Sequence, residues 1–319
     1  MTAAAVGGAR QRDLVWLTWR QYRAVLVIGV LVVVALIGFE LASYLALGRY
    51  VCATFCIDAA RNMTINRTGE LLTVGNALFA AFVAVFWAAP LVAREYEART
   101  YVVAWTQDVT PERWLVSRTA HLLVATVVLA AVVGLAGTVV VDRIQAIAPD
   151  WNEPFASYEY ESSIPLQIAY AVFGFALGLL VSLTLRRTVM SIGVTVVGFA
   201  ITRIAVAIWA RPHFLPPARA LGPVSDHGSP QASGLFVASG FVDNAGNQVS
   251  MSVVQGCAAT GDGYPTCLAD HGVAHRFLDY QPADRVGTFQ LIEFAIFAVL
   301  AIGLLALAWM GVRRITRVG

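Results

Sequence analysis

The sequence predicts an all-α membrane protein with six transmembrane helices, an N-terminal amphipathic elbow helix, and a small loop-rich extracellular subdomain between the fifth and sixth helices. Of its 319 residues, 58% are hydrophobic and 13% are charged, whereas soluble proteins average about 45–50% apolar and about 25% charged. Six apolar runs are as long as the roughly 20 residues that cross the hydrocarbon core as a helix. Charged polar segments separate these runs, so we expect the chain to cross the bilayer repeatedly.

Residues 1–23 are expected to form a cytoplasmic N-terminus with an interfacial elbow helix. Between Arg10 and Arg23, leucines, tryptophans and a tyrosine alternate with arginines, which is typical of an amphipathic helix lying at the membrane surface. The alternative is that this segment is only the charged flank of the first span. A cleavable signal peptide is not expected, because the apolar run that follows is long enough to cross the membrane.

The hydrophobic runs divide the chain into three further parts. Residues 24–209 are expected to hold the first five spans and a cytoplasmic loop at 94–118, residues 210–287 an extracellular subdomain, and residues 288–319 the sixth span with a cytoplasmic C-terminus. The expected spans are about 24–47, 71–93, 119–141, 164–185, 189–209 and 288–312.

The arginines predict the orientation of these spans. With the N-terminus inside, 13 arginines fall in short cytoplasmic segments and eight fall in outer segments, whereas the acids divide as five inside and 13 outside. Cytoplasmic loops carry an excess of positive charge, and short loops count most. We therefore expect both termini to be cytoplasmic in a bacterial plasma membrane.

The polar stretch 94–118 is the longest cytoplasmic loop in this arrangement. It carries eight charged residues, interleaved with Tyr96, Tyr101, Trp105 and Trp114. A charged rim around aromatic anchors suits a short helix docked in a groove of a soluble partner. The alternative is an interfacial loop without a partner, since aromatic residues also anchor at lipid headgroups.

Two patches of this sequence resemble the permease subunits of ABC-2 type (type V) exporters from high-GC Gram-positive, actinobacterial-type bacteria. The first comprises Arg94-Glu95-Tyr96-Glu97, Ala104-Trp105-Thr106-Gln107 and Arg113-Trp114-Leu115, and the second comprises the runs 277–285 and 288–293. The resemblance implies a permease that dimerises with a second copy or a paralogue, each copy docking one separate ABC ATPase. It also implies that a coupling helix contacts this ATPase, with these candidate residues: Arg94, Glu95, Tyr96, Glu97, Arg99, Thr100, Trp105 and Gln107.

No lysine occurs in the chain, and all 22 basic residues are arginines. A P-loop requires a lysine on the nucleotide phosphates, so we expect no ATPase activity and no cofactor in this chain. ATP and magnesium would be bound by the partner ATPase. The dispersed arginines form no basic stripe, which argues against a nucleic-acid partner.

All four cysteines are expected on the outer, oxidising side, where disulfides persist. We favour the local pairs Cys52–Cys56 and Cys257–Cys267, although pairing between the two outer segments remains an alternative. A metal site at these cysteines is not expected, since we identify no cysteine at metal-ligand spacing from a histidine. Asp270 and His271 with His275 are the nearest alternative metal cluster, and ordinary solvated residues are the preferred interpretation.

Three ionisable residues interrupt apolar spans: Glu40, Arg203 and Glu293. At about 1.5 Å of rise per residue, each lies roughly 6–11 Å beneath the outer surface. A charge at this depth is costly unless it is paired or hydrated. We therefore predict an outer-leaflet polar cluster, in which Glu40, Glu293 or both neutralise Arg203 as a gate latch or a structural clasp. The alternative is that each side chain extends separately to the headgroups.

The predicted function is export of a hydrophobic or amphipathic substrate along an apolar path at the dimer interface, between the second and fifth helices. The candidate lining residues are Phe79, Phe82, Phe86, Val194 and Phe199, and each of them alone is as well explained by helix packing. The alternative function is a membrane sensor whose extracellular subdomain binds a ligand without transport. An intramembrane enzyme is disfavoured, because no catalytic pair is placed within a span.

Overall fold

The computed structural model describes residues 11–49, 58–98, 111–148, 153–224, 233–258 and 264–318. The chain forms two compact units. Unit 1 comprises Met1–Asn152, Ser157–Arg203 and Gln290–Gly319, and unit 2 comprises Glu153–Ala156 and Ile204–Phe289.

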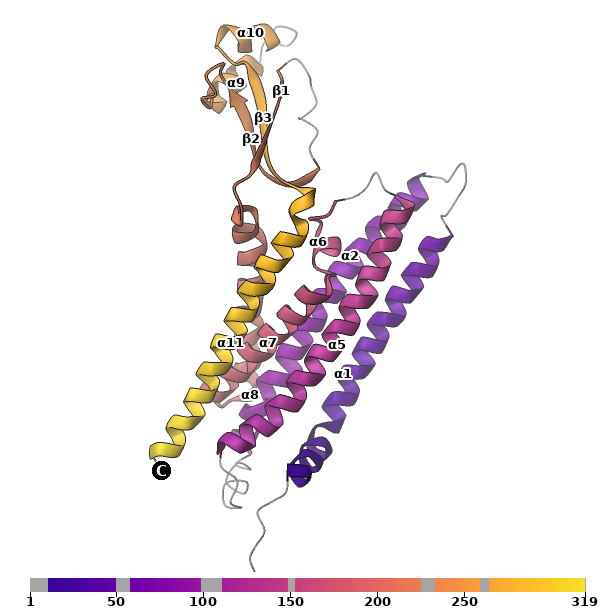
Figure 1. Ribbon diagram of the computed structural model, residues 1–319, viewed down its shortest axis with the longest axis vertical. Helices are drawn as coiled ribbons and strands as arrows, with labels where there is room; N and C mark the ends of the chain where they lie inside the picture. The colour runs from indigo at the N-terminus through magenta and orange to yellow at the C-terminus, as the bar shows by residue number, and fades with distance from the viewer. Residues whose placement is uncertain are drawn as a thin grey trace, which may run out of the picture. The chain divides into compact units, whose positions relative to one another are not determined.

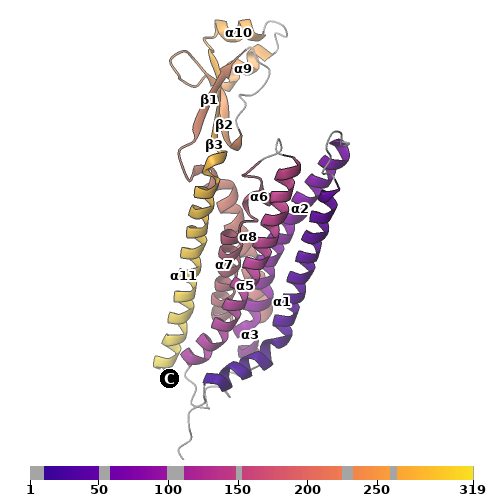
Figure 2. The ribbon, with the colours of Figure 1, turned by 45° about the vertical axis from the view of Figure 1, so that its right-hand side comes forward.

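Long helices make up unit 1, where they run side by side (Figures 1 and 2). They are α1 (Gln11–Gly48), α2 (Asp58–Phe82), α3 (Ala89–Glu97), α5 (Pro111–Ile147), the short α6 (Ser157–Tyr160), α7 (Ile164–Leu185), α8 (Thr188–Ile204) and most of α11 (Val286–Val318). A π-helical turn, η1 (Val83–Ala88), joins α2 to α3 without a break. Six helical stretches are long and apolar enough to cross a membrane, which confirms the prediction of a six-span helical membrane protein.

Several helices extend beyond the hydrophobic runs that predicted them. The second spanning stretch, Asn62–Glu97, begins nine residues before the expected Leu71. The predicted loop 94–118 is correspondingly shorter, because α3 continues to Glu97 and α5 begins at Pro111. The residues expected to form a separate interfacial helix are the first turns of α1. Hydrophobicity marks the part of a helix that lipid can cover, and the polar turns at either end continue the same backbone hydrogen bonds.

Helix α7 is the centre of unit 1, since 61% of its most apolar window is buried, compared with 22% for the stretch that contains α8. It packs against α5, α2, η1 and α3. Two glycines allow this close approach: a Cβ at Gly174 would lie 3.1 Å from Ala80 O, and one at Gly178 only 2.6 Å from Ala84 O. Small residues four apart, with alanines opposite, let membrane helices pack backbone to backbone.

Unit 2 contains an antiparallel sheet of three strands in the order β1-β3-β2, where β1 is Ala218–Pro223, β2 is Gly234–Val242 and β3 is His275–Pro282 (Figure 1). Two short helices, α9 (Met251–Ala258) and α10 (Tyr264–Asp270), follow β2. The subdomain that was expected to be loop-rich thus also contains a small sheet and two short helices. Glycine and proline punctuate the segments around its strands.

Side-chain contacts stabilise unit 2 in addition to the strand ladder. Arg219 on β1 donates two hydrogen bonds of 2.8 Å to Asp279 on β3, and these bonds raise the pKa of Arg219 above its usual value. Gln281 donates to the backbone carbonyls of Pro212 and Leu215, at 3.1 and 2.6 Å. The strands are thereby tied to the segment that precedes them.

The predicted disulfide between Cys257 and Cys267 is confirmed, and it links α9 to α10. Both cysteines pack on an apolar cluster that includes Phe241, Leu268 and Val273. Cys52 and Cys56 lie outside the described residues, so their pairing stays a prediction.

Candidate functional site

The end of α3 is bound to the start of α8 through Glu97. Its carboxylate accepts a hydrogen bond of 2.9 Å from the backbone N–H of Thr188 and one of 2.6 Å from the Thr188 hydroxyl. The first N–H groups of a helix have no partner within the helix, and the N-terminus carries partial positive charge. Glu97 therefore caps α8 from a position 91 residues away in the chain.

Tyr96 makes a second contact at the same place. The guanidinium carbon of Arg186 lies 4.8 Å from the centre of the Tyr96 ring, which is a cation–π geometry. Arg186 ends α7 with a left-handed backbone (φ 53°), and its N–H bonds the carbonyl of Ser182. The turn between α7 and α8 is thus held against the last turn of α3 by one charged and one aromatic side chain.

The sequence predicted Arg94 to Glu97 as contacts for an ATPase, and the structure places them in two kinds of surroundings. Arg94 is exposed, and Glu95 is half-buried. Tyr96 and Glu97 bind the α7–α8 turn of the same chain. Arg99, Thr100, Trp105 and Gln107 lie outside the described residues. Thr188 was not predicted, although a threonine directly after two arginines at the start of an apolar run is a recognisable helix start.

A buried polar cluster lies at the other end of α7 and α8. An Arg203 nitrogen is 2.6 Å from a carboxylate oxygen of Glu161, and the other terminal nitrogen is 3.8 Å from Glu293. The guanidinium carbon lies 3.4 Å from the centre of the Tyr170 ring. The hydroxyls of Tyr160 and Tyr170 donate to the two oxygens of Glu293, at 3.1 and 2.7 Å. Charge and phenol hydrogen bonds thus join α8, α7, α11 and the segment after α6.

Burial makes this cluster energetically important. The Glu293 side chain is fully buried, and those of Glu161 and Arg203 are 7% and 13% exposed. A buried charge is tolerated only when partners replace its water. Arg203 contacts two carboxylates here, so removing it would take a counter-charge from both acids.

The cluster differs in membership from the one that the sequence predicted. The structure places Arg203 beside Glu293, and it adds Glu161, Tyr160 and Tyr170. Glu40 is buried on α1, and one of its carboxylate oxygens has no hydrogen-bond partner within the described part of the chain. Glu161 was missed because it follows the third span in a polar stretch that was assigned to the outer surface. In the structure α6 packs against α2 and α5, and Gln167 donates to the Glu161 carbonyl at 2.8 Å.

Among the described residues, the five side chains expected along a substrate path lie on different surfaces. Phe79, Phe82 and Phe86 line an apolar groove of about 450 Å³ whose other lining residues come from α1, α2 and η1. Val194 is 47% exposed on α8. Phe199 is buried and stacks on Phe173 of α7, with ring centres 6.0 Å apart. Gly174 lies between these two sets, because a Cβ there would meet both Ala80 O and the Phe199 ring.

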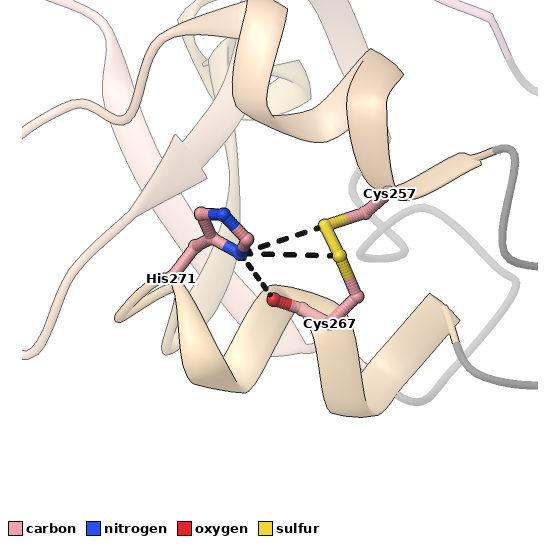
Figure 3. Close-up of a disulfide and its surroundings, with 3 residues drawn as sticks. All are labelled: Cys257, Cys267 and His271. Atoms are coloured by element: carbon pink, nitrogen blue, oxygen red, sulfur yellow. Dashed lines mark hydrogen bonds between the residues drawn. A yellow bond between two sulfur atoms is a disulfide. The ribbon is translucent and has the colours of Figure 1, made fainter.

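In unit 2, the Cys257–Cys267 disulfide lies beside a histidine that the sequence did not single out as its neighbour. Nδ1 of His271 is 3.8 Å from Sγ of Cys257 and 3.9 Å from Sγ of Cys267 (Figure 3). The expectation that no cysteine lies at ligand spacing from a histidine was therefore wrong. Cys267 and His271 are four residues apart, one helical turn, and face each other from the end of α10.

Comparison with known proteins gives one result. The profile of the family described as ABC-2 membrane transporter related matches residues 24–211, which is more than half of the chain and contains both the Glu97–Thr188 contact and the Arg203–Glu161 pair. No significant match was found among curated proteins, and none among solved structures.

Proposed function

The chain belongs to the ABC-2 membrane transporter related family, and on this basis we propose that it is the membrane subunit of an ATP-driven exporter. The family supports a permease subunit that spans the membrane several times and works with an ABC ATPase. We further propose that both termini are cytoplasmic, that two copies or paralogues form a type V dimer, and that each copy binds one ATPase.

The contact between Glu97 and Thr188 carries the proposed mechanism. The resemblance places the ATPase-binding segment within residues 94–107, and Glu97 in that segment is bonded to the first residue of α8. A displacement of α3 by the ATPase would therefore be passed to α8 through two hydrogen bonds and the Tyr96–Arg186 contact. In this mechanism Arg94 faces the ATPase, whereas Glu97 acts within the chain.

The second part of the mechanism concerns the far end of α8. Arg203 on α8 is held by Glu161 and Glu293, so that end of the helix is anchored by buried charge. A helix driven at one end and clasped at the other would tilt about the clasp. We propose that the cluster made by Arg203, Glu161, Glu293, Tyr160 and Tyr170 serves as this clasp during each transport cycle.

The proposed cargo is hydrophobic or amphipathic. The groove lined by Phe79, Phe82 and Phe86 contains only apolar lining residues, and exposed Val194 offers an apolar surface on α8. Because α7 separates these two surfaces within one chain, a shared path requires the α8 of one copy to face the α2 of the other. The dimer would then complete the path.

The test is to co-express the chain with a candidate ABC ATPase from the same genome and to measure ATP hydrolysis by the complex in lipid nanodiscs. Glu97→Ala and Thr188→Val should preserve assembly of the complex and lower its hydrolysis rate several-fold. Thr184→Val, at an exposed position four residues earlier at the end of α7, is the matched control and should keep the wild-type rate, because the Thr184 hydroxyl donates to carbonyls of its own helix. If no ATPase assembles with the chain, the membrane sensor becomes the better explanation. If one assembles and both variants hydrolyse ATP normally, the Glu97 mechanism is wrong.

A further inference from the structure

Three metal-binding side chains converge in unit 2 around the Cys257–Cys267 disulfide. The ligand atoms of Cys257, Cys267 and His271 all lie within 4.8 Å of one another. In the oxidised form the sulfurs are bonded to each other, and Nδ1 of His271 lies 2.8 Å from the Cys267 carbonyl oxygen. We propose that reduction of this disulfide opens a binding site for zinc made by these three side chains.

Nδ1 of His271 already lies at nearly the distance from both sulfurs that a zinc site requires. Zn–S bonds of about 2.3 Å and Zn–N bonds of about 2.05 Å put nitrogen and sulfur about 3.6 Å apart in a tetrahedral site. The observed distances from His271 Nδ1 are 3.8 and 3.9 Å (Figure 3). The two sulfurs must separate to about 3.8 Å, and they do so once their bond is broken. A water molecule would take the fourth position.

The surroundings keep the ligands in place when the disulfide is absent. Cys257 and Leu268 are buried in the apolar cluster that joins α9 to α10. His271 follows α10 directly, where its N–H bonds the Cys267 carbonyl and Val273 N–H bonds the Leu268 carbonyl. Gly272 adopts φ +74°, which lets the chain turn immediately after His271. The backbone at His271 is therefore held by hydrogen bonds that do not involve the sulfurs.

The chemistry balances with a small thiol as the reductant. Two thiol molecules give two electrons and two protons to the disulfide, leave as their own disulfide, and produce the thiols of Cys257 and Cys267. Zinc then displaces one proton from each thiol, and His271 gives up its Nδ1–H bond to the Cys267 carbonyl, carries its proton on Nε2 and binds through Nδ1. The site is closed to metal while the disulfide is intact, because bonded sulfurs have no thiolate to offer.

Cobalt binding to the full chain in detergent tests this proposal. Cys52→Ser and Cys56→Ser remove the other two cysteines, so that Cys257 and Cys267 are the sole thiols. After reduction with a phosphine, Co²⁺ should bind one equivalent per chain and show thiolate-to-cobalt charge-transfer absorption, and Zn²⁺ should displace it. The oxidised chain should show neither signal.

The role of His271 is tested by comparison with a neighbouring histidine. His271→Asn should weaken Co²⁺ binding by at least about 10-fold, whereas His275→Asn, at the exposed start of β3, should leave it unchanged. Circular dichroism of the reduced chain reports whether α9 and α10 stay folded. Absence of cobalt binding after reduction, whether or not the helices persist, would overturn the proposal, and so would equal affinity in the two histidine variants. None of these readouts depends on transport or on an ATPase.

Discussion

Replacing Arg203 with leucine is expected to destabilise unit 1 strongly. The change leaves Glu161 and fully buried Glu293 without the guanidinium that lies 2.6 and 3.8 Å from them. Removing one partner of a buried ion pair costs about 3–5 kcal/mol, because the remaining charge stays buried and unpaired. At about 2 °C per kcal/mol for a chain of this size, the thermal midpoint should fall by about 6–10 °C.

The assay is thermal unfolding of the purified chain in detergent, followed by tryptophan fluorescence at one fixed scan rate, since unfolding of such proteins is often irreversible. Arg67→Gln is the control, because Arg67 is exposed on α2, and exposed positions usually change stability by less than about 0.5 kcal/mol. Adding Glu161→Gln and Glu293→Gln to Arg203→Leu should recover at least half of the loss, since the two buried side chains that Arg203 contacts are then neutral.

A fall of less than about 2 °C for Arg203→Leu would refute this reasoning. It would mean that water or lipid headgroups reach the two carboxylates, as expected if each charged side chain extended separately to the membrane surface. If Arg203→Leu alone does not accumulate in the membrane, the triple variant is examined in its place. Accumulation of the triple variant supports the explanation by loss of the counter-charge, and absence of the triple variant from the membrane contradicts it.

Three further predictions concern other parts of the chain. Gly178→Ala should destabilise the chain by about 1–3 kcal/mol in the same thermal assay, because its Cβ would meet Ala84 O at 2.6 Å. The control is Gly193→Ala on α8, where a Cβ meets nothing within 4 Å, and this change should be neutral or slightly stabilising. Equal effects of the two changes would contradict the packing of α7 on η1. Glu97→Ala should speed amide hydrogen exchange at the start of α8 about fivefold, which corresponds to loss of a helix cap worth about 1 kcal/mol. An unchanged exchange rate at Thr188 would show that the Glu97–Thr188 contact is not formed in solution. In unit 2, hydrogen bonds from Asn247 hold the pKa of Asp243 below its usual 3.8. The ionised carboxylate therefore stabilises the turn 243–247 above pH 3.8, and the turn should lose its amide protection only as the pH falls through the lowered pKa. Protection that disappears near pH 6 would exclude Asp243 as the group responsible.

The sequence predicted the spans well because a bilayer imposes one simple requirement, a long apolar run. It did not predict that α2 begins at Asp58, since the turns before Leu71 are polar and resemble a connecting loop. It also gave no sign of the π-helical turn at Val83–Ala88, which adapts α2 to the surface of α7.

The polar contacts were harder to predict than the helices. Glu293 and Arg203 attracted attention because a charge within an apolar run is unusual. Glu161 stands among other acids of a polar stretch, so nothing in the sequence distinguished the one that folds inward. The partner of Glu97 is 91 residues away, and such pairings depend on how α3 and α8 are placed by the whole bundle.

Photo-crosslinking to the ATPase tests most directly whether the Arg94 end of this permease receives the driving force. A photoreactive amino acid would be placed at exposed Arg94 or, as the control, at Met63, which is 70% exposed. About 46 Å of continuous helix separates the two positions. In cells that express the candidate ABC ATPase, we expect a covalent adduct with that ATPase from position 94 and none from position 63. An adduct from position 63 alone would mean that the ATPase binds the opposite end of the bundle and that the proposed orientation is reversed.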